Sequence, residues 1–261
     1  MKKRILLPAI LCMAISIFTA SCSSDDIESP EAKEQMVTLT VSAGSEDDAA
    51  ATRAVLSEAD AAKSPWKWEE GDKILLVSGN GSQKTVSELT LKSTKRDGLS
   101  GEFEGQVPAS SVTNGSTYRF FYVGKTSDGR TDRTIDASTG SINIDLTQQT
   151  GELKDLKRNC VLTGTGKVSV SVSGTKATTE GDIILSNVFA VAHFAIAATN
   201  NTPLTKVGLR GKGVYASANV DLSTGAVTGV SEIGTEIDPE ENIFFPEGKT
   251  DFYVTFVPGS V

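Results

Sequence analysis

Histidine is almost absent from this chain, and cysteine is scarce. The 261 residues contain one histidine, His193, and three cysteines, Cys12, Cys22 and Cys160. A single imidazole excludes a histidine-rich metal site, and one distant histidine is a poor base for a catalytic thiol. Cys12 and Cys22 lie near the N-terminus, so Cys160 has no partner for a disulfide framework. We therefore predict no cofactor, and we interpret Cys160 as a small buried apolar residue.

Positive charge is also in short supply. The formal net charge is −8, and removal of residues 1–21 takes away Lys2, Lys3 and Arg4 with no acidic residue, which makes it −11. An acidic chain repels phosphates, and no cluster of lysines and arginines with interleaved aromatics occurs. Nucleic acid is therefore excluded as a partner.

A long apolar run is missing, and the longest N-terminal one is too short to span a bilayer. Ile5–Phe18 covers fourteen residues, follows a basic start and precedes the small residues Thr19, Ala20 and Ser21. This is the pattern of a secretory signal. With Cys22 next, it resembles a bacterial lipoprotein signal, although Thr19 stands where the usual motif has Leu, Val or Ile. We predict a signal peptide at 1–21 and a lipid on Cys22.

The residues after Cys22 form an acidic, polar tether over 22–35. Ser24–Glu28 is similar to the acidic signal that sends Bacteroidetes lipoproteins to the outer face of the outer membrane. The resemblance implies a surface-exposed lipoprotein anchored to the cell outer membrane. A plain secretory signal followed by a solvated tether is the alternative.

Period-two alternation dominates the remaining chain. In Met36–Ser42 the residues Val37, Leu39 and Val41 would face a core, while the residues between them face water. Further strand-like stretches recur at the short spacing typical of β-sandwiches. They are 74–77, 86–91, 99–107, 117–123, 141–146, 161–162, 167–173, 182–185, 207–209, 214–220, 226–230 and 252–257. We predict an all-β fold of two sandwich lobes, 36–185 and 186–261.

Three stretches are less regular. Val188–Ala198 is the longest apolar run after the signal, and its periodicity fits either a buried strand or a helix. Gly151–Arg158 is consistent with a short helix or turn. Gly164–Lys167 lacks the spacing of a phosphate-binding loop, and we predict a hairpin turn there.

Several local motifs, taken in order, resemble the fimbrillin family of Bacteroidetes pilus subunits. They are Trp68 with Gly71–Ile74, Phe103–Gly105 leading to Tyr118–Tyr122, Gln148–Leu156, Leu185–Phe194, Lys206–Leu209 and Phe252–Pro258. The order and rough spacing fit nearly the whole chain after the signal. No single motif is specific, but the set behind a lipoprotein signal is.

The resemblance implies two transthyretin-like β-sandwich lobes and assembly by strand exchange. In the family, a trypsin-like protease cuts after an arginine, the N-terminal strand leaves, and a strand from the next subunit takes its place. Mapped here, Arg53 is the cleavage site, and Val37, Leu39 and Val41 are the side chains that leave. The family continues past the stretch matching Phe252–Pro258, so strand donation by a chain ending at Val261 stays open.

The sequence thus predicts a non-enzymatic structural or adhesive subunit of a cell-surface fimbria. Its partners would be other fimbrial subunits, the outer membrane through Cys22, and surface ligands on host or bacterial cells. The alternative is a monomeric glycan-binding lipoprotein that uses exposed aromatics such as Trp66 or Tyr118. We interpret Trp68 as a core residue beside the strand 74–77. A hydrolase is a third class, but Glu69 and Glu70 are adjacent and would point to opposite faces of a strand.

Overall fold

The computed structural model describes residues within the range 34–258. The described residues are 34–45, 67–79, 84–124, 133, 135–136, 138–149, 151, 156–198, 203–204, 207–209, 214–231, 235–237, 243–244 and 248–258. By its contacts the chain divides into a unit of residues 1–33 and a unit of residues 34–261, and every described residue belongs to the second. Cys22, Arg53 and Trp66 lie outside the described residues.

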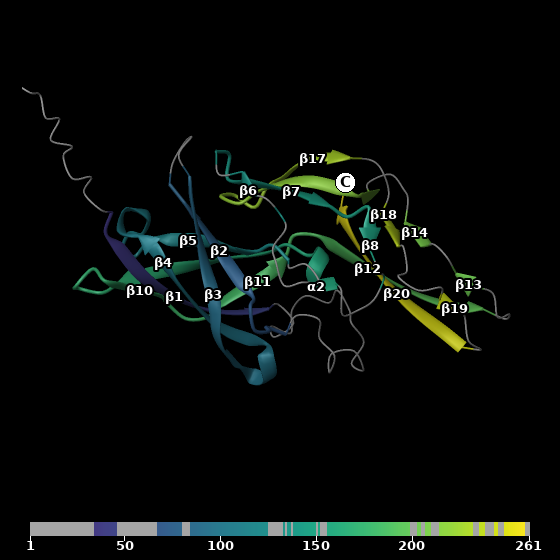
Figure 1. Ribbon diagram of the computed structural model, residues 1–261, viewed down its shortest axis with the longest axis horizontal. Helices are drawn as coiled ribbons and strands as arrows, with labels where there is room; N and C mark the ends of the chain where they lie inside the picture. The colour runs from purple at the N-terminus through teal and green to yellow at the C-terminus, as the bar shows by residue number, and fades with distance from the viewer. Residues whose placement is uncertain are drawn as a thin grey trace, which may run out of the picture. The chain divides into compact units, whose positions relative to one another are not determined.

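The described part of the chain is built almost wholly from β-strands, which confirms the all-β prediction (Figure 1). The strands are β1 Met36–Ser45, β2 Lys73–Ser78, β3 Thr85–Lys95, β4 Ser100–Pro108, β5 Thr117–Tyr122, β6 Ile135–Asp136, β7 Ser141–Asp145, β8 Gln148–Gln149, β9 Leu162–Val170, β10 Lys176–Thr179, β11 Ile183–Asn187, β12 Ala190–Ala198, β13 Pro203–Leu204, β14 Val207–Leu209, β15 Val214–Tyr215, β16 Ser217–Asp221, β17 Val227–Ser231, β18 Thr235–Ile237, β19 Ile243–Phe244 and β20 Gly248–Pro258. Helical structure in the same residues is limited to α2 Leu156–Asn159 and the short 3₁₀ turns Arg96–Gly98 and Ala109–Ser111.

The largest sheet among the described residues has eight strands and closes on itself. Its order is β10-β1-β11-β9-β5-β2-β3-β4, and further pairings join β1 to β4 and β10 to β9. β10 and β11 follow one another along the same edge of β1, so they share one position in the ring. This barrel-like closure differs from the predicted β-sandwich because the pairing of β1 with β4 joins the two ends of the strand order.

The other strands form smaller sheets, and two of them join strands from either side of residue 186. β7 pairs antiparallel with β16 over five residue pairs, and β8 pairs parallel with β18. A third sheet has the order β12-β20-β15. The predicted lobes 36–185 and 186–261 stay a prediction, but these pairings cross their boundary.

The stretch that periodicity left open is a strand. β12 pairs antiparallel with β20 from Ala190↔Phe256 to Ala198↔Gly248. The nine consecutive cross-strand pairs join one edge of β12 to β20, so this apolar run is a strand and not a helix. The predicted short helix within 151–158 corresponds to α2, which begins at Leu156.

The turn predicted at Gly164–Lys167 is wrong, because these residues lie inside β9. A Cβ atom at Gly164 would stand 2.3 Å from the carbonyl oxygen of Ile184, and one at Gly166 would stand 2.6 Å from Cδ1 of Ile183. The glycines therefore make room for β11 to pass close to β9. Glycine in a strand can mark close approach of another backbone as well as a turn.

Two hydrophobic clusters fill the described region, and β2 and β5 contribute to both. Ile74 and Leu76 of β2 belong to the first cluster, whereas Leu75 and Val77 belong to the second. β5 alternates in the same way, and Phe120 and Phe121 are both fully buried. A strand buried on both faces is apolar at every position, which explains the unbroken run Ile74–Val77.

The first cluster contains the residues that the sequence placed in a core. Trp68 is 4% exposed and meets Phe103 and Tyr122 edge-on, with ring centroids 5.0 and 5.3 Å apart. Cys160 is also buried in this cluster. The interpretations of Trp68 and Cys160 as core residues are confirmed.

Candidate functional site: the seam around β1

β1 has one buried and one partly exposed face. Val37, Leu39 and Val41 are at most 1% exposed and belong to the first hydrophobic cluster. Thr38, Thr40 and Ser42 alternate with them and are half-buried. This confirms the orientation predicted from the period-two pattern. Burial of each of the three apolar side chains stabilises the fold by about 1.5–3 kcal/mol.

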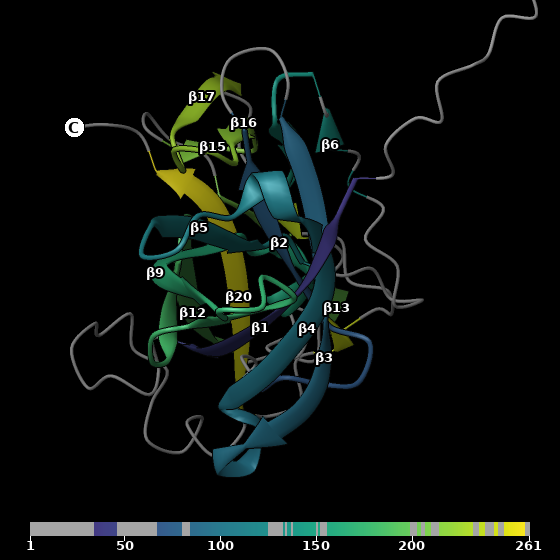
Figure 2. The ribbon, with the colours of Figure 1, turned by 90° about the vertical axis from the view of Figure 1, so that its left-hand side faces the viewer.

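One edge of β1 is bonded without interruption to β4. The antiparallel register runs through nine consecutive pairs, from Met36↔Pro108 to Gly44↔Ser100. Before the strand begins, the carbonyl oxygen of Gln35 accepts a hydrogen bond from the Ala109 amide at 2.7 Å. Figure 2 shows β1 in purple alongside β4.

The opposite edge of β1 is bonded in two separate pieces. Residues 38–40 pair parallel with 176–178 of β10, and residues 43–45 pair parallel with 183–185 of β11. Residues 180–182 connect the two ladders, and no β10 or β11 residue is paired with positions 41 and 42. We call the edges of β4, β10 and β11 that bind β1 the β1 seam.

The side chains of Thr179 and Asp182 bind β1 where the two ladders are interrupted. The hydroxyl of Ser42 donates a hydrogen bond to Oδ1 of Asp182 at 2.5 Å. The Ser42 amide donates to the hydroxyl of Thr179 at 3.4 Å. Sequence reasoning missed Thr179 and Asp182, although the Gly181-Asp182 dipeptide between two strand-like stretches is a turn signal.

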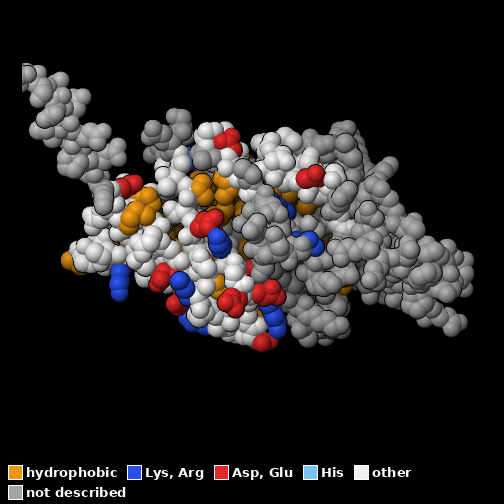
Figure 3. Space-filling view, viewed as in Figure 1, with side chains coloured by type: hydrophobic (Ala, Val, Ile, Leu, Met, Phe, Trp, Pro, Cys, Tyr) orange, Lys and Arg blue, Asp and Glu red, His pale blue; other side chains and the backbone are white. Residues whose placement is uncertain are grey.

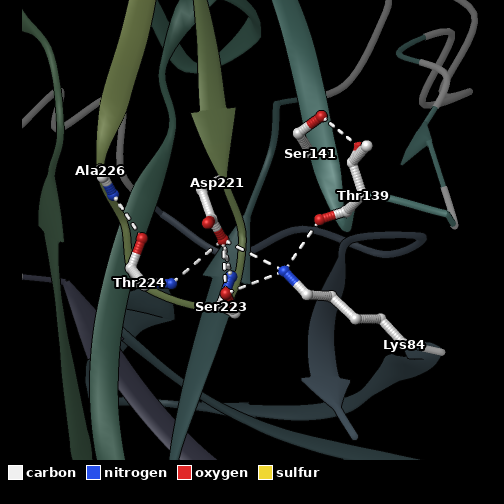
Figure 4. A network of polar contacts seen from close by, with 7 residues as sticks. All are labelled: Lys84, Thr139, Ser141, Asp221, Ser223, Thr224 and Ala226. Atoms are coloured by element: carbon white, nitrogen blue, oxygen red, sulfur yellow. Dashed lines mark hydrogen bonds and ion pairs between the residues drawn. The ribbon is translucent and has the colours of Figure 1, made fainter. Parts of the chain in front are cut away.

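A polar junction ties the start of β3 to a turn after β16 (Figure 4). The Lys84 ammonium donates to the Thr139 carbonyl at 2.8 Å and to the Ser223 hydroxyl at 3.0 Å, and it lies 3.7 Å from Oδ1 of Asp221. Partial burial opposes ionisation of Asp221. Hydrogen bonds from Ser223 and Thr224 and the charge of Lys84 outweigh it and hold the pKa of Asp221 below its ordinary value.

Arg133 is half-buried and lies outside the strands. Its guanidinium donates to the carbonyl oxygens of Val123, Cys160 and Arg158 at 2.6, 3.1 and 2.9 Å. Burial lowers the pKa of Arg133. Several carbonyls on one guanidinium hold neighbouring chain segments together, so the structure gives this residue a role in stability.

Of the two aromatic residues considered for glycan binding, only Tyr118 lies within the described residues. Tyr118 is half-buried against the first cluster, and its hydroxyl accepts a hydrogen bond from the Thr113 amide at 2.6 Å. Trp68 is buried. His193 is exposed on β12 and stacks on Tyr253 with a centroid separation of 4.6 Å.

On the face drawn in Figure 3, charges of both signs are interspersed among the described residues. Exposed ion pairs join Lys67 to Asp97, Lys73 to Glu88, Lys95 to Glu102 and Lys167 to Glu180. Such pairs contribute little to stability. Within the described residues, no helix is long and apolar enough to cross a membrane.

Comparison with known proteins gives distant structural neighbours. No protein-family model and no curated sequence matches the chain. One solved structure, of "a putative cell adhesion protein" from Bacteroides ovatus, is similar with a TM-score of 0.48 and 14% identity, covering 86% of this chain and 78% of that one. Another, of a fimbrial assembly protein from Parabacteroides distasonis, has a TM-score of 0.35 and 11% identity, covering 87% and 88%.

Proposed function

We propose that this chain is a structural or adhesive subunit of a cell-surface fimbria that assembles by strand exchange at the β1 seam. The observation that carries the proposal is that β1 closes the barrel from both edges without pairing to β2, the strand that follows it in the described chain. Removing β1 would expose unpaired backbone on β4, β10 and β11. An incoming strand from another subunit would restore those hydrogen bonds and fill the apolar positions.

The position of β1 in the sequence favours its release by a protease. Residues 46–66 connect β1 to the rest of the fold and include Arg53. Cleavage after Arg53 separates β1, together with any lipid on Cys22, from residues 54–261. An uncut subunit would remain attached to the outer membrane, and a cut subunit would be free to join a fimbria. We propose no enzymatic activity.

Limited trypsin digestion of the folded chain from Cys22 onward tests this proposal. We expect a new N-terminus at Ala54, followed by incorporation of the cut protein into larger particles when partner subunits are added. In a Lys63→Gln background, which removes the other trypsin site of segment 46–66, Arg53→Lys should behave like its parent, whereas Arg53→Gln should keep β1 attached and stay monomeric. Cleavage that unfolds the protein, or assembly that is equal for Arg53→Gln, would contradict strand exchange.

The alternative, a monomeric glycan-binding lipoprotein, has less support. Of the aromatics proposed for sugar stacking, Tyr118 packs against the core and Trp66 lies outside the described residues. Binding of a glycan array by the uncut protein, lost in Trp66→Ala and kept in Tyr118→Phe, would favour this alternative.

A further inference from the structure

The β1 seam provides sites of different size for the successive inward-facing side chains of a strand. We infer that it accepts an extended strand whose inward side chains are medium, large, medium and small in that order, with a hydroxyl just before the small one. This inference rests on the proposed function, because it describes the strand that would replace β1. In the present chain these positions are Val37, Leu39, Val41 and Ala43, with the hydroxyl on Ser42.

The position of Leu39 has room for a large side chain. Its antiparallel partner is Gly105 of β4, and its parallel partner is Ala177 of β10. Gly105 must remain a glycine because a Cβ atom there would stand 2.2 Å from the carbonyl oxygen of Glu88. Leu39 itself is fully buried beside these two small partners, so its side chain fills this part of the first cluster. A small side chain there would leave a cavity.

The position of Ala43 is already filled by its neighbours. Its antiparallel partner is Gly101, and its parallel partner is the buried Ile183. The space in front of Gly101 is taken by three side chains that would meet a Cβ atom there: Leu91 at 2.6 Å, Phe103 at 3.0 Å and Trp68 at 3.2 Å. Ala43 is itself fully buried. A leucine at this position would have to displace the packed aromatic pair of Trp68 and Phe103.

The interruption between β10 and β11 adds a polar requirement. At position 42 the incoming strand meets the side chains of Asp182 and Thr179 in place of a backbone ladder. A hydroxyl can donate to the Asp182 carboxylate, whereas a methyl group cannot. Hydrogen bonds to a charged acceptor are stronger than neutral ones, but this contact is exposed and its contribution is correspondingly smaller.

Together these features fix the register of the incoming strand. A shift by two residues keeps apolar side chains inward but places the wrong size at each position. A shift by one residue reverses the two faces. The seam should therefore reject strands that are equally apolar but differently ordered.

Peptide exchange on the full chain tests this inference. A site-specific protease sequence is inserted in the segment 46–66, the folded protein is cut, and labelled peptides covering residues 34–47 are added in mild denaturant that is then removed. Retention of label is measured by size-exclusion chromatography and fluorescence anisotropy. The peptide of native sequence should be retained, and Thr40→Ala, which changes the outer face, should compete within about two-fold of it.

The decisive control has the same composition as the native peptide. A peptide with Leu39→Ala and Ala43→Leu preserves the apolar content but reverses the size order, and we expect it to bind at least about 100-fold more weakly. Ser42→Ala should weaken binding about five-fold. That loss should disappear when the protein carries Asp182→Ala, because the hydroxyl then has no carboxylate to bind.

The outcomes separate this inference from the proposed function. If the native peptide is not retained, strand exchange itself is contradicted. If the native and reversed peptides are retained equally, exchange stands but recognition by size is overturned. If Ser42→Ala weakens binding equally in the wild type and in Asp182→Ala, the polar part of the inference is overturned.

Discussion

β1 and β2 are both strands of the closed sheet, but they are held in different ways. β2 sends alternate side chains into two hydrophobic clusters and has no solvated face. β1 sends alternate side chains into one cluster and keeps Thr38, Thr40 and Ser42 half-exposed. β2 pairs antiparallel with β3 and β5, whereas β1 has a split parallel edge. This contrast underlies our proposal that β1 leaves and is replaced, whereas β2 and β5 stay in place as a framework.

The largest expected effect comes from replacing a large buried side chain of the framework with alanine. Phe121→Ala in β5 removes a fully buried ring from the second cluster. It should lower the free energy of unfolding by about 3–5 kcal/mol, because lost burial and a residual cavity add. Urea unfolding followed by fluorescence measures this. A loss below about 1 kcal/mol would mean that β5 is not part of a permanent framework.

Replacing a buried side chain of β1 with alanine should lower the free energy of unfolding by less, and its effect should be more local. Leu39→Ala should lower the free energy of unfolding by about 2–4 kcal/mol. In hydrogen exchange, the amides of β4 at residues 100–108 should lose protection before those of β2, because β1 opens first. Thr40→Ala is the matched control on the outer face and should leave β4 protected. Equal loss of protection in β2 and β4 would break the proposed distinction.

The close contact between β3 and β4 beside the seam should not tolerate a residue larger than glycine at position 105. Gly105→Ala places a Cβ atom against the Glu88 carbonyl and should destabilise the protein by about 1–3 kcal/mol. Gly71→Ala provides a comparison, since its Cβ would meet nothing within 4 Å and only its φ of +87° is strained. Thermal unfolding measures both. A larger effect at Gly71 would argue against the tight contact.

The smallest effect concerns the Lys84 junction and depends on pH. Because the pKa of Asp221 is depressed in the folded protein, its contribution is present above the unfolded pKa, near 4, and is lost as pH falls through the folded pKa. The wild type should therefore be more stable than Asp221→Asn at pH 7, and the difference should shrink below about pH 4. Urea titrations at pH 7, 5 and 3 measure it. A difference that stays constant would remove the ionised carboxylate from the explanation.

Much of the framework follows from local sequence. The alternation in Met36–Ser42 predicted which side chains of β1 face the core, and the unbroken run Ile74–Val77 predicted a buried strand. Trp68 and Cys160 were also placed correctly. These successes share one cause: side chains alternate across a strand, so burial leaves a period-two or continuous pattern in the sequence.

The errors arise where one segment passes close to another. Gly164 and Gly166 looked like a turn because no local signal separates turn glycines from glycines that make room for β11. Arg133 does lie outside the strands, but its contacts were missed because the carbonyls it binds come from residues 123, 158 and 160. Neither the β11 residues near these glycines nor the carbonyls bound by Arg133 can be recognised from the neighbouring sequence.

By itself, the sequence determined that the chain is strand-rich and acidic with a single histidine, and which face of β1 is apolar. Only the tertiary structure decided that β1 seals a ring from both edges, and that its positions differ in size. Alternation specifies a face, which is a local property. The partners at that face, Gly105 with Ala177 and Gly101 with Ile183, come from strands more than 50 residues away. Such contacts depend on how strands pair, and pairing is a property of the whole fold.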